Sequence, residues 1–240
     1  MGVFQMSERM LRDKILPVLS AMSMLLAIGM IIFYLPDMKG AMGETLDMSF
    51  RIFYFHMPIA ITSYLAFTVV FVSSILFLRT GKYSYDILSR SAAEVGVIFA
   101  FLVLVTGSIW AKATWGWYWV WEPRLTTSLA LFLVYVAYIV LRQAVDGADK
   151  RARLASVFGI LGFISVPLSF LSIRLWRSAH PLMFGDTSGS SGGGLEGTSL
   201  QLTLLVNVIA FVLLFITLVV YKMQNEMMEE RADEIRASLD

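Results

Sequence analysis

The sequence predicts an all-α integral membrane protein with six transmembrane helices and both termini in the cytoplasm. Hydrophobic residues make up 58% of the 240 residues, charged residues make up 15%, and the mean hydropathy is +0.72. A soluble domain of this length carries more charge and has shorter apolar runs. Six runs approach the roughly 20 apolar residues that a spanning helix needs, and backbone polar groups in lipid must be satisfied within such a helix. We therefore expect a single helical membrane domain.

The six expected spans follow one another without an internal repeat. They cover residues 15–36, 52–78, 92–111, 125–141, 154–173 and 200–221. The first run is too long for a secretory signal peptide and has no small-residue cleavage site, so we expect it to be retained. Pro58 is expected either to open the second helix or to kink its first turn. Pro167 is expected to kink the fifth helix.

The basic residues predict the orientation. Thirteen of the nineteen Lys and Arg residues lie on the side that holds both termini, and six lie on the other side. Cytoplasmic loops are enriched in Lys and Arg, so the majority side is expected to be cytoplasmic. The loop at 110–124 and the loop at 174–199, which is rich in Gly and Ser and therefore flexible by composition, then lie outside. Residues 222–240 are expected to form a cytoplasmic tail, either a solvated helix or a docking site for a partner.

The composition excludes several functions. The chain has no cysteine, which rules out disulfides, zinc thiolate sites, iron–sulfur clusters and haem attached through CxxCH. The net charge of +1 gives no reason to expect a nucleic acid partner. No phosphate-binding GxxxxGK[ST] loop is present, so any use of ATP must come from another subunit. No HExxH motif occurs either, and we expect no enzymatic activity. No span carries a charge near its middle, which argues against an ion-driven transporter.

Five of the six tryptophans lie in the stretch WAKATWGWYWVWEPRLTT, residues 110–127. Four of these five alternate along the chain, at Trp115, Trp117, Trp119 and Trp121. An extended backbone would place all four on one face, whereas a helix would separate them into two pairs. Either backbone would give a broad aromatic surface. An interfacial tryptophan belt is the alternative, but belts are spread over many helix ends. The gathered tryptophans favour a platform for a large planar ligand.

The two histidines of the chain, His56 and His180, are both expected on the side of the tryptophan loop. A single interfacial histidine is more often structural than a ligand. However, two imidazoles can ligate iron from opposite faces, and Arg51 and Arg124 on the same side could pair with two propionates. With the tryptophans as apolar cover, these residue types are those of a haem site.

Three motifs resemble one known family. FRIFYFHMP (residues 50–58), TGSIWAKATWGWYWVWEPRLTT (106–127) and LWRSAH (175–180) are similar to motifs of the cytochrome c biogenesis haem-handling family, which carries a tryptophan-rich WWD-type motif. The resemblance covers essentially the whole chain, and the six-helix plan and length resemble the CcmC branch. It implies His56 and His180 as the axial ligands of haem iron.

The resemblance also implies a tryptophan motif that closes on Arg124. Its members would be Trp115, Gly116, Trp117, Trp119, Val120 and Trp121. The family motif normally ends in Trp-Asp, but here Glu122 follows and reaches one methylene further. Pro123 suits a first helical position, so Glu122 is expected either at the haem site or at the positive N-terminus of the fourth helix.

The implied activity is haem delivery for cytochrome c maturation. The family presents haem b, bound transiently and without a covalent link, at the outer face of the bacterial cytoplasmic (inner) membrane. Haem would then pass to a periplasmic haem chaperone of the CcmE type, with an ABC-type complex of CcmA and CcmB and the small membrane protein CcmD. Besides these partners, only membrane lipid is expected. Two alternatives remain open, namely a membrane cytochrome b that transfers electrons and a haem-free membrane scaffold.

Overall fold

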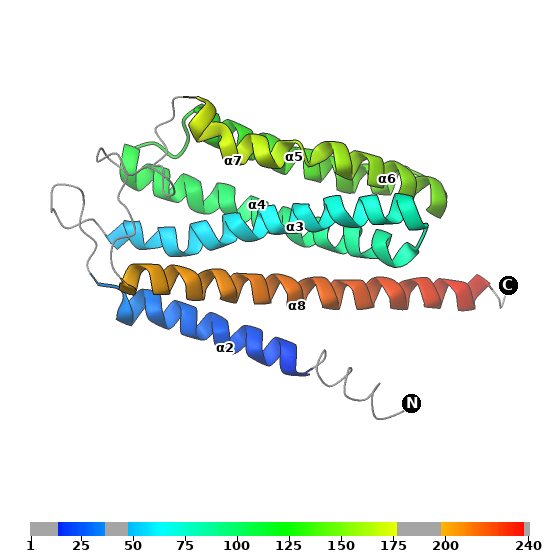
Figure 1. Cartoon of the computed structure of the whole chain (residues 1–240), viewed down its shortest axis with the longest axis horizontal. Coiled ribbons are helices and arrows are strands. Elements are labelled where there is room, and N and C mark those ends of the chain that lie inside the picture. Colours follow the sequence, from blue (N-terminus) through cyan, green and yellow to red (C-terminus); the bar gives the residue numbers. More distant parts are fainter. Residues whose placement is uncertain (1–13, 37–47, 177–197, 238–240) are drawn as a thin grey trace.

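The computed structural model of the protein describes residues 14–36, 48–176 and 198–237. Over these residues the fold is all-helical, without strands, and six helices are long and apolar enough to cross a membrane. The predicted fold class is confirmed to this extent, and the protein is a multi-pass membrane protein. Figure 1 shows the helices lying side by side in one bundle. Which end of this bundle faces the cytoplasm stays a prediction.

The helices follow the order of the expected spans, and most are longer than those spans. Their bounds are α2 (Leu16–Gly29) continued by the π-helical turn η2 (Met30–Tyr34), the 3-10 turn η3 (Met48–Ile52), α3 (Phe53–Thr80), α4 (Tyr83–Trp115), α5 (Pro123–Ala144), α6 (Ala148–Gly162), α7 (Ser165–Leu175) and α8 (Thr198–Ala237). The end of the bundle at which α4 ends and α5 begins is called the tryptophan end below, and the other is called the opposite end (Figure 1).

The hairpin of α3 and α4 forms the centre of the bundle. Gly96 makes this close packing possible, because a Cβ atom there would lie 2.9 Å from Ala66 Cβ and 2.9 Å from the Phe67 ring. Phe67 is fully buried and stacks on Tyr135 of α5, with ring centroids 3.6 Å apart. The hairpin is therefore held tightly, and it positions side chains from α3 and α4 at both ends of the bundle.

The fifth span breaks near its middle, as Pro167 predicts. Proline lacks the N–H that would bond to the carbonyl four residues earlier, which belongs to Phe163. That carbonyl accepts instead from the Val166 N–H at 3.0 Å, and the break separates α6 from α7. Pro58 lies inside α3, after its first turn, and does not open the helix.

The tryptophan loop is shorter than residues 110–124. Helix α4 continues to Trp115 because the first helix-ending residue is Gly116, whose φ of 78° is the left-handed conformation of a C-cap. The loop ends at Pro123, the first residue of α5, and the Glu122 carboxylate accepts a hydrogen bond from the Leu125 N–H at 2.8 Å. The non-helical part is thus residues 116–122. In the last part of the chain, helix α8 continues through most of the predicted tail (residues 222–240) and ends at Ala237.

Candidate ligand-binding site

A cleft opens at the tryptophan end between α3, α4 and α5. Its lining includes His56 from α3, Gly107, Trp110 and Trp115 from α4, Trp119 from the loop and Arg124 from α5. The cleft holds about 630 Å³ of empty space when its open mouth is counted, but only about 70 Å³ admits the centre of a water molecule. The cleft is therefore open to the outside and has room for only a few water molecules within it.

His56 lies in the first turn of α3, is only 6% exposed, and faces α4. Its Nδ1 atom lies 2.9 Å from the Thr106 Oγ1 atom, which also lies 2.7 Å from the Leu102 carbonyl oxygen. The carbonyl can only accept, so the single hydroxyl proton of Thr106 is donated to it. Thr106 therefore accepts the proton that His56 carries on Nδ1. The lone pair of the neutral imidazole is then on Nε2, the arrangement usual for histidines that ligate metals.

Two neighbours fix the position of the imidazole ring. A Cβ atom at Gly107 would lie 3.1 Å from His56 Cε1, so a side chain at this position of α4 would push the imidazole ring by a few tenths of an ångström. The Trp110 ring meets the His56 ring edge-on, with centroids 5.8 Å apart. Both contacts come from α4, so the central hairpin that builds the core also sets the orientation of this histidine.

Of the two arrangements expected for the alternating tryptophans, the structure shows two pairs rather than one shared face. Trp115 and Trp119 line the cleft, whereas Trp117 and Trp121 are 69% and 77% exposed and lie outside its lining. The alternation fails because Trp115 belongs to a helix and the following residues form an irregular loop. Trp119 and Trp121 still touch edge to face, with centroids 5.5 Å apart.

The cleft lining includes the polar donors of Trp119 and Arg124. The indole N–H of Trp119 is buried and has no hydrogen-bond partner among the described residues. Arg124 is half-buried, donates to the Ser169 carbonyl of α7 at 2.5 Å, and lies 5.8 Å from the Tyr64 ring centroid. No carboxylate in the described part of the chain forms an ion pair with Arg124. Together the two donors could bind a carboxylate at the rim of an apolar ligand.

The structure places the remaining predicted residues differently. Arg51 donates to the carbonyl oxygens of Ile31 (2.8 Å), Ile32 (3.2 Å) and Leu35 (3.3 Å). Its guanidinium therefore caps the last carbonyls of the first span. It is not part of the cleft lining. Of the two roles expected for Glu122, the structure shows the helix cap, and Gly116 ends α4. His180 lies outside the described residues, so its position relative to His56 stays a prediction.

Sequence reasoning missed a stripe on α4 that faces the cleft. Val103, Gly107, Ala111, Thr114 and Trp115 recur at intervals of one to four residues and line it. This helical spacing was a usable signal, because residues three and four apart share one face of a helix. Treating residues 110–124 as a loop concealed it.

The fold and the cleft define a class, a helical multi-pass membrane protein with an aromatic, histidine-containing ligand cleft at one end of its bundle. The sequence model of the CcmC family, described as heme exporter protein C, matches residues 4–238. The chain belongs to this family, as its motifs indicated.

Individual relatives agree. The heme exporter protein C of Bradyrhizobium diazoefficiens is 35% identical over 228 residues, which is 94% of this chain and 84% of that protein. The Escherichia coli K12 protein of the same name is 31% identical over 177 residues, 74% of this chain and 70% of its own length. That of Haemophilus influenzae is 31% identical over 188 residues, 77% of this chain and 74% of its own.

Proposed function

We propose that the protein binds haem at the tryptophan end and passes it on for cytochrome c maturation. Membership of the heme exporter protein C family supports this function. The observation that carries it is the His56 imidazole, which lines an aromatic cleft with Nδ1 donating to Thr106. This arrangement favours Nε2 as an iron ligand.

Each side chain of the cleft has a role in this proposal. Nε2 of His56 ligates the iron from one face, and His180 supplies the second axial nitrogen. Trp115 and Trp119 cover part of the apolar porphyrin. Arg124 and the Trp119 N–H bind a propionate. Haem b is held without a covalent bond, in keeping with a chain that has no cysteine.

The shape of the cleft supports transfer rather than storage. A cavity with about 70 Å³ for water centres cannot enclose a whole porphyrin, so most of the ring would lie at the open mouth. The exposed rings of Trp117 and Trp121 belong to the same loop as Trp119, and an acceptor could contact them there. Electron-transfer haems are usually enclosed. This difference favours haem delivery over the alternative of a membrane cytochrome b.

The proposed partners complete the pathway. The acceptor is a periplasmic haem chaperone of the CcmE type, and the chain acts with ABC-type subunits of the CcmA and CcmB kind and with CcmD. The location is the bacterial inner membrane, with the tryptophan end outside. The chain itself performs no bond-making chemistry. Since it lacks a phosphate-binding loop, energy from ATP would come from the ABC-type subunits.

The test is a haem titration of the purified protein, followed by its visible absorption. The wild type should show a saturable Soret band, and His56→Gly should lose the six-coordinate spectrum because an axial nitrogen is gone. Added imidazole should restore that spectrum in His56→Gly, since the small molecule can fill the space left by the ring. A six-coordinate spectrum in His56→Gly without imidazole would contradict the proposed ligand.

The same sample separates the alternatives. A wild type without any Soret band would support the haem-free scaffold. A haem that stays bound when the haem chaperone is added would support the cytochrome b.

A further inference from the structure

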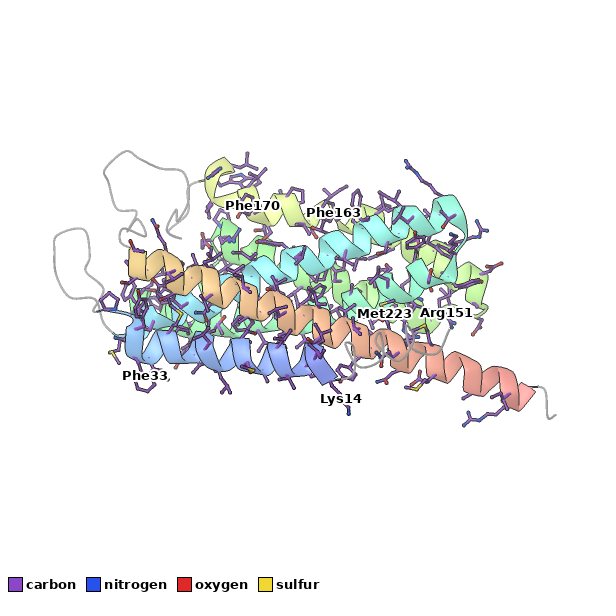
Figure 2. The ribbon with its side chains drawn as sticks, turned by 60° about the horizontal axis from the view of Figure 1, so that its bottom comes forward. Lys14, Phe33, Arg151, Phe163, Phe170 and Met223 are labelled. Carbon is purple, nitrogen blue, oxygen red and sulfur yellow. The ribbon has the colours of Figure 1, made fainter. Side chains whose placement is uncertain are left out.

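A second cleft lies at the opposite end of the bundle, between α4, α5 and α6. It leaves about 210 Å³ for water centres, three times the space at the tryptophan end. Arg90 of α4, Arg142 of α5 and Arg151 of α6 line it together with Glu94 and Gln143. Figure 2 shows Arg151 at the end of the bundle away from Phe33 of η2. We propose that this cleft binds a phosphate group with a single negative charge.

The charges around the cleft leave room for one anion. Its lining and the direct ionic partners of that lining contain four cations and three carboxylates. The cations are Arg90, Arg142, Arg151 and Lys222, and the carboxylates are Asp86, Glu94 and Glu226. Four minus three leaves one uncompensated positive charge. A phosphodiester carries one negative charge and would neutralise it.

The carboxylates of the cluster are already engaged. Asp86 accepts from both terminal nitrogens of Arg142, at 2.6 and 2.7 Å. Glu94 lies 3.0 Å from Arg90 Nε and 2.8 Å from Lys222 Nζ, and Glu226 pairs with the same two cations. Glu94 is therefore neutralised from two sides, so its presence in the lining does not repel an incoming anion.

Two of the three arginines retain donors for a ligand. Arg142 is 8% exposed, and its buried Nε has no hydrogen-bond partner among the described residues. A buried donor of this kind is costly unless a water or a ligand satisfies it. Arg151 is half-buried and makes no ion pair within the described part of the chain. Guanidinium groups bind phosphate oxygens through paired N–H donors.

The position of the cleft indicates where the phosphate comes from. All three arginines lie near the ends of candidate membrane spans. Arg90 lies near the start of α4, Arg142 near the end of α5 and Arg151 near the start of α6. Ends of spans lie at the headgroup layer, and basic pockets between helices bind anionic lipid headgroups there. A lipid phosphodiester is thus the favoured ligand, and inorganic phosphate is the soluble form of the same chemistry.

Native mass spectrometry of the detergent-purified full chain tests the site. The probes are phosphatidylglycerol, phosphatidylcholine as the zwitterionic control, and inorganic phosphate. We expect one copy of phosphatidylglycerol to be retained in preference to phosphatidylcholine. Arg151→Gln should weaken this retention about tenfold, the loss of one charge-assisted contact. The matched control is Arg153→Gln, an exposed arginine of the same helix outside the cleft, which should bind like the wild type.

The outcomes distinguish a lipid headgroup from free phosphate as the ligand, and they test this cleft separately from the proposed haem site. Preference for phosphatidylglycerol that depends on Arg151 supports a lipid site. Binding of inorganic phosphate alone, with the same dependence on Arg151, supports a soluble phosphate ligand. Equal retention of both lipids without phosphate binding, or equal effects of Arg151→Gln and Arg153→Gln, would overturn the site. Haem titration of Arg151→Gln should match the wild type, so failure here leaves the haem proposal intact.

Discussion

The two clefts of this bundle differ in the groups that hold their polar and charged side chains. At the tryptophan end, His56 and Arg124 are held by neutral partners, a hydroxyl and a backbone carbonyl, amid aromatic rings. At the opposite end, Arg142 and Arg90 are held by carboxylates. The neutral partners leave the Arg124 charge unbalanced by any carboxylate of the described residues, whereas the charges of Arg142 and Arg90 are balanced by carboxylates. The first cleft thus suits a large apolar ligand. In the second cleft the ion pairs stabilise the bundle and leave one positive charge uncompensated.

Removing a carboxylate at the opposite end should have the largest effect on stability. Asp86→Ala leaves Arg142 charged and buried without its bidentate partner, which costs about 3–5 kcal/mol of unfolding free energy. Thermal unfolding in detergent measures it. Asp149→Ala is the control, because this carboxylate lies on the surface and bonds to the Tyr83 hydroxyl at 2.5 Å. We expect a change within about 0.5 kcal/mol for the control. Equal unfolding midpoints for the two variants would refute a stabilising role for the buried pair.

Filling the space beside His56 should weaken binding at the tryptophan end. Gly107→Val adds a Cβ atom 3.1 Å from His56 Cε1 and two methyl groups beyond it. Overpacking of this kind costs about 1–3 kcal/mol of unfolding free energy. The ring must move, so haem affinity should fall at least about tenfold. Gly29→Ala is the matched glycine control, since a Cβ there meets nothing within 4 Å. Titration with haem measures both, and unchanged affinity in Gly107→Val would show that the ring position is unimportant.

The tryptophans offer a test within one loop. Trp119→Ala removes a ring that lines the cleft, and the lost apolar contact should cost about 1.5–3 kcal/mol of haem binding free energy. Trp121→Ala removes an exposed ring and should cost clearly less. Haem titration of both variants decides between them. If Trp121→Ala were the more damaging change, the exposed face rather than the cleft would hold the porphyrin.

The smallest expected effect concerns the residue behind the histidine. Thr106→Val keeps the shape but cannot accept the His56 Nδ1–H, and loss of such a partner typically lowers metal affinity about tenfold. The Soret and visible bands should shift because the imidazole becomes a weaker donor. Thr106→Ser keeps the hydroxyl and should retain the wild-type bands. Identical spectra for the valine and serine variants would remove Thr106 from the site.

Local signals in the sequence were sufficient to predict the helices and their order. Hydropathy predicts the spans because burial in lipid depends on composition, and Pro123 and Pro167 mark a helix start and a helix break through their missing N–H. Pairings between distant residues could not be predicted. His56 meets Thr106 fifty residues later, and Asp86 meets Arg142 after fifty-six. Such contacts depend on how helices pack, which hydropathy does not record.

Arg51 shows why residue type alone was insufficient. The sequence placed it near the other outer residues, and the carbonyls at the end of the first span bind its guanidinium instead. The last carbonyls of any helix attract a cation, so an arginine at a helix end has two possible partners. Sequence reasoning could not decide between a backbone and a ligand as that partner.

The break before Pro167 makes α7 a helix separate from α6, so α7 contacts the cleft on its own. Arg124 is fastened to the Ser169 carbonyl on α7, and the chain beyond α7 leads within a few residues to His180. The orientation of Arg124 therefore depends on the position of α7 as well as on α5, which carries this residue. The two polar groups of the cleft thus depend on separate parts of the bundle, His56 on the α3–α4 hairpin and Arg124 on a short helix beyond a chain break.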